Sequence, residues 1–523
     1  MRCLRNSVDS LIVLAPSGLQ SALRAAIGVD LDVTILAGEE IASPQGLCRA
    51  VEGEEARWGP VDEVIVTDDS WFGPAAPLAP VFERMTAQRH STWTMMGSSA
   101  YSTMWIGIER VFFAEWARCG GELGAALERI ASEAQTAGAV AFPQPVDEAV
   151  AHGGAPLVPI ALFIDPPGTL DLPHVVRTIE NAGLRAGTVA QHLARHIDPR
   201  TLNARLALMS VLPVGGTSEY PTDRTMDVRV VVHVEPGHAV EGIIPALRLL
   251  APLSRLVATV ADEDVRRVQR AFESHALTVE IRPVDPREGQ MGALLRGCSE
   301  LLRADSLDDL LVAIRVGTVR GSVPRVKQYR IRHSQTAVFA DAVHLNAVLD
   351  LFHGDPHLGF VLPPVIAIGG EDLGSGWRGR VERAAALRRS LGVEVPLGDS
   401  PLEPPAGIWI ARVAALGTLR RYPLTAADHR RDTVEGGVLE ALIAHVVGAN
   451  GFSSRTVIDP RGAAISHADL EYTLDQLAAA IRGTPTQQIQ LLTRMGDLGD
   501  GSVKATLRAA WRRARANRRA NRA

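Results

Sequence analysis

Two adjacent aspartates and a serine, Asp68, Asp69 and Ser70, follow a short apolar run and precede a Gly73-Pro74 turn. The run is rich in strand-forming residues, so it predicts a strand that carries the acids at its carboxyl end. Open α/β sheets bind their ligands at that end of their strands. Carboxylate oxygens suit Mg²⁺ and Mn²⁺, so the pair could hold such a cation against a nucleotide diphosphate. Ordinary turn and cap chemistry is the alternative interpretation of the same residues.

Two further patterns could also do chemistry. Residues 374–379, GSGWRG, have the GxGxxG spacing of a phosphate-binding loop and lie between a strand-like and a helical run, with Glu394 placed like a ribose-binding acid. The motif lies deep in its domain, so a common Gly-rich surface loop is the competing interpretation. His192 and His196 could share a metal ion across one helical turn, but no HExxH glutamate accompanies them, and surface histidines are the simpler interpretation.

The composition is that of a globular protein with more than one core. A chain of 523 residues suggests about two to four domains. With 46% hydrophobic and 22% charged residues, it has enough apolar surface to fold. No apolar stretch reaches the roughly 18 residues that span a bilayer, and the chain starts without a secretion signal, so we expect a cytoplasmic protein. The four cysteines lack CxxC spacing, which argues against a zinc site or a disulfide framework.

The end of the sequence is strongly basic. Residues 504–523 contain eight Lys and Arg residues and no acid. In helical register Arg508, Arg512, Arg515 and Arg519 form one stripe, which predicts contact with an anionic membrane surface at the inner face of the membrane. A frayed, solvated tail is the alternative. Only two of the 54 basic residues in the whole chain are lysines, a bias typical of a GC-rich genome, and we expect no nucleic-acid partner.

Strand-like and helix-like segments alternate in two parts of the chain. Residues 1–140 predict a first α/β lobe, with helical periodicity over 104–135. Residues 141–222 predict a mainly helical connector. Several short apolar, β-branched runs in 223–452 predict a second α/β lobe built on a doubly wound sheet. Residues 453–523 are expected to be helical and to end in the basic tail.

The order of these segments resembles the rhamnan synthesis protein F family, bacterial glycosyltransferase-like proteins of cell-wall and O-antigen polysaccharide assembly. Residues 62–85, DEVIVTDDSWFGPAAPLAPVFERM, look like that family's strand, Asn-Asp-Ser, Gly-Pro and helix signature. The following MWIGIERVFFAEW is placed like its long aromatic helix. Later, LNAVLDLFHGDPHLGFVLPPV and PPAGIWIARVAAL look like further blocks of the family, in the same order.

The resemblance implies two glycosyltransferase-like α/β lobes related to the GT-A type. Such a protein would transfer a sugar, with rhamnose as one candidate, from a nucleotide sugar to a cell-wall, surface-polysaccharide or lipid-linked acceptor. Asp68 and Asp69 would then face Mg²⁺ or Mn²⁺ and the diphosphate, and Ser70 and Gly73 would complete the nucleotide-sugar site. The pattern identifies no catalytic base.

Polar positions of the second lobe depart from the family pattern. Gln290 in PREGQMG replaces an acid, and Arg315 and Gly317 replace a His and Lys pair. An apolar framework without this polar chemistry indicates an alternative function, a catalytically degenerate binding or scaffold protein in polysaccharide assembly that pairs with an active glycosyltransferase. A third candidate is an oxidoreductase that binds a nicotinamide or flavin cofactor through 374–379.

Overall fold

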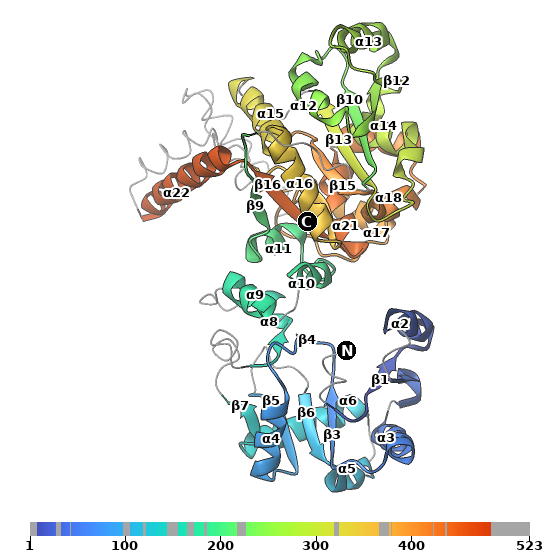
Figure 1. The fold of residues 1–523 in the computed structure, drawn as a ribbon, viewed down its shortest axis with the longest axis vertical. Coiled ribbons are helices and arrows are strands. Elements are labelled where there is room, and N and C mark those ends of the chain that lie inside the picture. The colour runs from blue at the N-terminus through green and yellow to red at the C-terminus, as the bar shows by residue number, and fades with distance from the viewer. Residues whose placement is uncertain are drawn as a thin grey trace, which may run out of the picture. The chain divides into compact units, whose positions relative to one another are not determined.

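The computed structural model shows two compact units, Met1–Val189 and Ala190–Ala523, each built from sheets and helices (Figure 1). In the described part of the chain, no helix combines the length and the apolar character needed to cross a membrane. The structure describes residues 8–27, 33–41, 43–97, 105–118, 122–143, 155–164, 172–181, 186–216, 226–317, 324–365, 376–377, 379–421, 423–434 and 437–482.

A four-stranded sheet in the order β3-β6-β5-β7 forms the centre of the first unit. The strands β3 (Glu63–Thr67), β5 (Thr92–Met96) and β7 (Val140–Phe142) run in one direction, and β6 (Trp105–Glu109) runs in the opposite direction between β3 and β5. Ile106 and Ile108 of β6 belong to a core shared with the helices that cover the sheet. These helices are α3 (Pro44–Trp58), α5 (Arg110–Ala117) and α6 (Leu123–Thr136).

Two small sheets complete the first unit. In one, β1 (Ile12–Ala15) pairs in parallel with β2 (Thr34–Ala37), and in the other β4 (Trp71–Phe72) pairs antiparallel with β8 (Val158–Pro159). The remaining helices up to the unit boundary are η1 (Ser17–Leu19), α2 (Gln20–Ile27), η2 (Gly38–Ile41), α4 (Ala79–Gln88), α8 (Ala161–Ile164), α9 (Leu172–Asn181) and α10 (Ala186–Leu193), the last of which crosses that boundary.

The prediction of a helix over 104–135 is wrong at its start, where the chain forms β6. Trp105, Ile106 and Ile108 are all buried, because β6 is an inner strand of its sheet. A short run that is apolar on both faces fits a buried strand and a buried helix equally well, so periodicity could not separate them. The helical prediction holds for α5 and α6, which follow β6.

The second unit is built on an eight-stranded sheet in the order β12-β11-β10-β13-β15-β14-β16-β9. Seven strands are parallel, and only β15, which lies between β13 and β14, is reversed. The strands are β9 (Met209–Val211), β10 (Val228–Val234), β11 (Ser254–Val260), β12 (Glu280–Pro283), β13 (Leu310–Val316), β14 (Leu358–Leu362), β15 (Trp409–Arg412) and β16 (Ser453–Ile458).

This sheet corrects two sequence-based expectations. The doubly wound sheet contains the reversed strand β15, whose composition cannot reveal its direction because the strand is completely buried. Residues 453–458 form β16 instead of a helix, and β9 also joins the sheet, although both strands lie outside 223–452. The division into lobe, connector, lobe and tail stays a prediction.

Helices cover both faces of the second sheet, and each face has its own core. Alternate residues of β10 divide between the two cores, with Val231 in one and Val230 and Val232 in the other. The first core includes residues of α14 (Gly289–Gly297), α17 (Val381–Ser390), α20 (Val438–Ala441) and α21 (Ile443–Ala449). The second includes residues of α12 (Ile244–Leu250), α13 (Val265–Ser274), α15 (Pro324–Phe339) and α16 (Ala342–Gly354).

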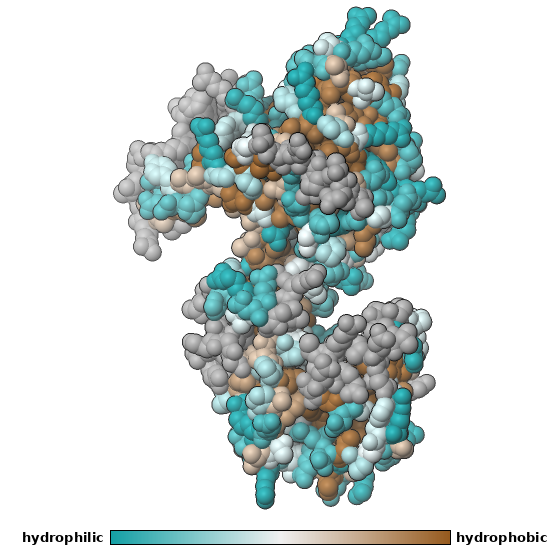
Figure 2. Space-filling view, in the orientation of Figure 1, coloured by the Kyte–Doolittle hydropathy of each residue, from teal (hydrophilic) through white to brown (hydrophobic). Residues whose placement is uncertain are grey.

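The helix α13 illustrates how these helices are made amphipathic. Val268 and Phe272, one turn apart, are buried against the sheet, whereas Arg266 and Arg270 are exposed. Figure 2 accordingly shows a hydrophilic surface around this helix. The other helices of the unit are η3 (Glu241–Ile243), η4 (Asp262–Asp264), η5 (Pro286–Glu288), η6 (Ser299–Leu302), η7 (Val413–Leu416), α11 (Pro199–Arg205), α18 (Gly417–Arg421), α19 (Ala426–Val434) and α22 (Pro460–Arg482).

The two units share one arrangement of strands. In the first unit the order is β3-β6-β5-β7, and in the second a block of the larger sheet has the order β13-β15-β14-β16. In both blocks the third strand along the chain is reversed and lies between the first and the second, and the fourth is parallel to the second. The carboxyl ends of β3 and β13 are therefore equivalent positions in the two blocks.

Candidate ligand sites

The acids of the first unit lie where the sequence places them, directly after β3. The predicted strand is confirmed, and it ends at Thr67. Asp68 and Asp69 are both exposed. The Oδ1 atom of Asp68 accepts hydrogen bonds from the backbone N–H of Ser70 at 3.1 Å and from its hydroxyl at 2.5 Å. Among the described residues, none donates a hydrogen bond to the Asp69 carboxylate, which is open to solvent.

The turn after the acids is fixed by β4 and β8. The Trp71 indole N–H donates to the Thr67 hydroxyl at 2.8 Å, and the Trp71 ring meets the Trp105 ring edge-on at 5.3 Å. Gly73 has a φ of +148°, and a Cβ atom there would lie 2.6 Å from the carbonyl oxygen of Pro156. Gly73 is thus required by the close approach of two backbone segments, which holds the acidic turn in place.

The acids can supply only part of a metal site. Within the described ranges, no group of three or more His, Cys, Asp or Glu side chains is placed to hold a metal ion. Mg²⁺ is commonly held by one or two carboxylates while phosphate and water oxygens complete its shell. Asp68 and Asp69 fit that incomplete type of site, because both face solvent at a strand end.

In the second unit the chain changes direction across the sheet at β10. From β10 the chain proceeds to β11 and β12 on one side, and it then returns to β13 on the other side. The carboxyl ends of strands at such a switch point form the usual ligand crevice of an open α/β sheet. Here Glu235 follows β10 and Arg315 lies near the end of β13.

Five polar side chains gather at this point, and we call them the switch-point cluster. The Arg315 guanidinium is 3.1 Å from the Glu440 carboxylate and 4.0 Å from the Glu235 carboxylate. His233 lies beside Arg315 on the neighbouring strand, and its Nδ1 is 3.1 Å from the Thr259 hydroxyl. Gln290, at the start of α14, donates to the carbonyl oxygen of Gly407 at 2.9 Å. The members are His233, Glu235, Gln290, Arg315 and Glu440.

Exposure divides the cluster into an outer and an inner part. The side chains of Glu235 and Arg315 are 30% and 21% exposed, whereas Glu440, Gln290 and His233 are buried. Burial, with a smaller contribution from Arg315, lowers the pKa of His233 to about 4, so the imidazole is neutral. Among the described residues, neither His233 Nε2 nor Gln290 Oε1 has a hydrogen-bond partner.

Two glycines make the cluster possible. A Cβ atom at Gly317, just after β13, would overlap the Glu235 carboxylate. Gly407 has a φ of +67°, and a Cβ atom there would lie 2.6 Å from Gln290 Oε1 and 2.9 Å from Arg315 Nε. These two polar atoms therefore both lie next to the position that a Cβ atom of residue 407 would take. Only glycine leaves that position empty.

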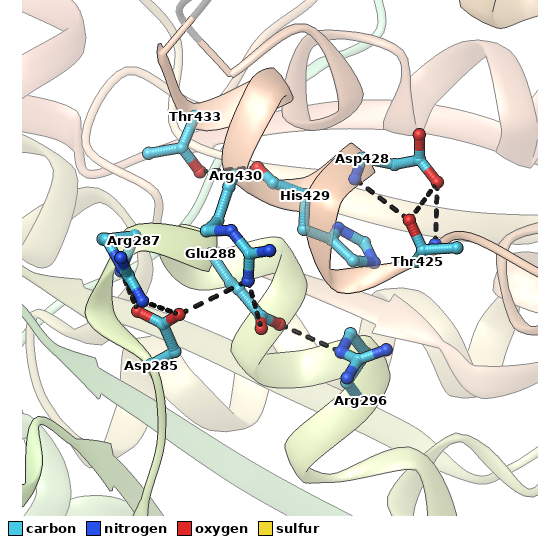
Figure 3. Close-up of polar contacts among 9 residues, drawn as sticks. All are labelled: Asp285, Arg287, Glu288, Arg296, Thr425, Asp428, His429, Arg430 and Thr433. Carbon is cyan, nitrogen blue, oxygen red and sulfur yellow. Dashed lines mark hydrogen bonds and ion pairs between the residues drawn. The ribbon is translucent and has the colours of Figure 1, made fainter.

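A polar network fixes the start of α14, and with it Gln290. Figure 3 shows Arg430 of α19 directed at Asp285 and Glu288, at 3.5 and 3.7 Å. Arg296 holds Glu288 from the other side at 3.0 Å. The adjacent Gly289 has a φ of +64° and lies against Thr433 of α19. This packing leaves Gln290 little freedom to move.

The other sequence motifs do not form sites in the described residues. The rings of His192 and His196 are 5.0 Å apart, without a third ligand in the described ranges. Of 374–379 only 376, 377 and 379 are described, and the buried Trp377 donates to the Gly398 carbonyl at 2.7 Å. The stripe of Arg508, Arg512, Arg515 and Arg519 lies outside the described residues.

Sequence reasoning missed three members of the switch-point cluster. Gln290 and Arg315 had been singled out, but His233, Glu235 and Glu440 had not. Glu235 had a usable signal, because it follows an apolar strand and precedes Pro236 and Gly237. Glu440 had none, since only tertiary packing brings α20 to β13.

No family model and no curated protein matches this chain. Two solved structures of glucosyl-3-phosphoglycerate synthase from Mycobacterium tuberculosis are similar to part of it. One, in complex with Mn²⁺, UDP and glucosyl-3-phosphoglycerate, is 17% identical and covers 54% of this chain and 88% of its own, with a TM-score of 0.22. The other, with Mn²⁺, UDP and phosphoglyceric acid, is 18% identical and covers 52% and 79%, also with a TM-score of 0.22. A TM-score this low does not establish a shared fold or activity.

Proposed function

We propose that this protein is a glycosyltransferase of the rhamnan synthesis F type that takes a sugar, with rhamnose as a candidate, from a nucleotide sugar to a cell-wall or surface-polysaccharide acceptor. One observation carries the proposal, the exposed pair Asp68 and Asp69 at the carboxyl end of a strand in an α/β sheet. We place the donor diphosphate there with Mg²⁺ or Mn²⁺, and the basic tail at the inner membrane face. Both lobes would be related to the GT-A type, as the mixed sheets with one reversed strand support.

Each residue of the acidic turn, Asp68 to Gly73, would have its own role in binding the donor. Ser70 fixes one oxygen of Asp68, so that carboxylate can offer its other oxygen in a constant direction. The Asp69 carboxylate would bind from solvent without breaking a protein hydrogen bond. A divalent cation bound there would offset the negative charge that develops on a departing nucleotide diphosphate. Gly73 would keep the turn close to the segment of Pro156.

Thermal unfolding with a panel of nucleotide sugars tests this proposal. dTDP-rhamnose, GDP-mannose and UDP-sugars are each added with and without Mg²⁺ or Mn²⁺. A ligand at about a hundred times its Kd stabilises the native state by about 2.7 kcal/mol. We expect one nucleotide class to raise Tm in a metal-dependent way, and the D68N/D69N double variant to lose this shift.

The exposed Asp62 provides a matched control at the opposite end of the same strand. Asp62→Asn should leave the nucleotide-sugar shift intact, because the carboxylate lies before β3 begins. If D68N/D69N folds with an unchanged Tm and still shows the full shift, the donor site is not at the acidic turn.

A second candidate function has its own observation. In the second unit, Gln290 stands where the family pattern has an acid, Arg315 and Gly317 stand where it has a His and Lys pair, and Arg315 is bound to Glu440. This favours a scaffold protein without catalysis that pairs with an active glycosyltransferase. Sugar transfer from a radiolabelled nucleotide sugar by the purified protein alone would eliminate this candidate.

A further inference from the structure

We propose that residues 486–498 pack against an exposed apolar stripe of the helix α22 and form a helical hairpin with it. The stripe, which we call the leucine stripe, consists of Leu470, Leu474 and Leu477. Spacings of four and three residues place these side chains on one side of a helix. The inference concerns an interaction surface of the second unit, so it goes beyond the proposed function.

The leucine stripe faces solvent. Leu470, Leu474 and Leu477 are 36%, 62% and 38% exposed, and Figure 1 shows α22 extending from the end of β16 away from the sheet. Among the described residues, five of the fifteen exposed large apolar side chains lie on this helix. The side of α22 that is partly covered is instead polar, and it consists of Ser466, Asp469, Thr473 and Gln476. Because this is the reverse of the usual arrangement, the leucine stripe indicates a docking surface.

The sequence directly after α22 predicts a turn and a second helix. The helix ends at Arg482, and the next residue, Gly483, is of the type that commonly follows a helix end. Thr484, Pro485 and Gln487 then have the types and spacing of the N-cap, N1 and N3 residues of a capping box. A connection of two residues suits a pair of antiparallel helices.

The predicted second helix has an apolar side of its own. In helical register this side is formed by Leu491, Leu492, Met495 and Leu498. Gly499 and Gly501 follow and predict the end of the helix. An isolated helix of this length is marginal in water, so it needs an apolar surface to pack against. These residues lie outside the described ranges, and the prediction depends on their sequence.

The two apolar sides match in their positions along the hairpin. Counted back from Gly483, the members of the leucine stripe lie 6, 9 and 13 residues away. Counted on from Thr484, residues at 7, 11 and 14 positions are Leu491, Met495 and Leu498. The two helices would run in opposite directions from the turn with a rise of about 1.5 Å per residue. Each leucine of the stripe would therefore lie within about 3 Å of the level of an apolar counterpart.

The charges beside the leucine stripe disfavour two other occupants. Glu471 and Asp475 are both exposed there, and an anionic membrane surface would repel them. In a two-fold pair with a second copy, the axis would pass near Leu474, the middle of the stripe, and these acids would face their own counterparts. Residues 486–498 carry no net charge, and in the hairpin Arg494 comes to a level between the two acids.

Hydrogen-exchange mass spectrometry on the full-length protein tests the inference. We expect the amides of 486–498 to exchange at least about tenfold more slowly than those of an unstructured chain. The L491D/M495D double variant places charges on the apolar side of the segment, which makes packing costly. It should speed exchange both in 486–498 and in α22 by about tenfold or more.

A matched control separates loss of packing from added charge. The Q490D/T493D double variant adds the same two charges on the opposite side of the predicted helix, so it should leave the exchange of α22 unchanged. Both variants should keep any nucleotide-sugar shift of the unmodified protein, because the acidic turn belongs to the first unit. A failure of this inference is thus distinguishable from a failure of the donor site.

Cross-linking supplies a test of proximity. A cysteine pair made by Leu477→Cys and Leu491→Cys should be joined within one chain by a short bismaleimide linker, and peptide mass spectrometry identifies the link. The control pair combines Leu491→Cys with Ala479→Cys. Ala479 is exposed on the side of α22 away from the leucine stripe, so this pair should link at least about tenfold more slowly.

Four results would overturn the inference. Two come from exchange: rates in 486–498 that equal those of an unstructured chain, or unchanged exchange of α22 in the L491D/M495D variant. The third is a dimer in light scattering that Leu474→Asp converts to a monomer, because a second copy would then cover the stripe. The fourth is protection of α22 that is seen only with vesicles of phosphatidylglycerol and phosphatidylethanolamine, because lipid would then be the occupant.

Discussion

The guanidinium of Arg315 in β13 donates a hydrogen bond to the carboxylate of Glu440 in α20, with 3.1 Å between Nη1 and Oε2. The contact joins a strand end to a helix that is 125 residues away in the sequence. It also sets the direction of the one cation in the switch-point cluster. The strength of this pair therefore bears on the stability of the second unit.

Breaking this pair from the helix side should destabilise the second unit. Glu440 is 8% exposed, so Glu440→Ala leaves the guanidinium partly buried without its partner, and we expect a loss of about 2 kcal/mol in the free energy of unfolding. Urea denaturation of Glu440→Ala, Arg315→Ala and the double variant would measure the coupling. A coupling energy near zero would mean that the contact contributes nothing to the free energy of unfolding.

Buried histidines should make stability depend on pH. Burial lowers the pKa of His233 and of His445 from 6.5 to about 4, so the unfolded chain binds more protons than the folded protein between these values. The stabilising contribution of these neutral histidines is therefore fully present above about pH 6.5. Below that pH the free energy of unfolding falls by up to about 1.4 kcal/mol per pH unit for each histidine. Urea midpoints at several pH values should show this fall. His445→Leu should make it shallower, and an unchanged slope would exclude His445 as a cause.

Alanine substitutions at two glycines of nearly equal φ should separate the energetic cost of backbone strain from the cost of side-chain crowding. Gly392 and Gly407 have φ of +66° and +67°, but only Gly407 has polar atoms within 3 Å of an added Cβ. Gly392→Ala should cost about 1 kcal/mol from the left-handed backbone alone. Gly407→Ala should cost about 1–3 kcal/mol more, because Gln290 and Arg315 must move. Thermal unfolding of both variants measures the difference, and equal losses would contradict the crowding.

The most deeply buried guanidinium of the second sheet should be essential for its stability. Arg412, 1% exposed, donates to the carbonyl oxygens of Leu307, Phe352 and Leu358. Arg412→Met leaves these carbonyls without their donor, and we expect a loss of about 3–5 kcal/mol in the free energy of unfolding.

The exposed ion pair of Arg255 and Glu280 supplies the control for this variant. The Arg255 side chain is 58% exposed, so Arg255→Met should change stability by less than about 1 kcal/mol. Chemical denaturation of both variants makes the comparison. A loss at Arg412 as small as the loss at Arg255 would show that the buried hydrogen bonds contribute nothing net.

The sequence alone determined the elements whose pattern is local. The strand before Asp68 and Asp69 and the helix within 467–482 were predicted from periodicity and are present, because alternation and helical spacing depend on neighbours in the chain. The same local reasoning singled out Gln290 and Arg315 as unusual polar residues.

Only the tertiary structure decided the direction of the strands and which side chains lie next to Gln290 and Arg315. β6 and β15 are reversed between parallel neighbours, and a strand buried on both faces has the same composition in either direction. Glu235, Arg315 and Glu440 meet because β10 and β13 are neighbours in the sheet and α20 packs over them. These two contacts join residues 80 and 125 positions apart, separations at which sequence spacing carries no information about distance.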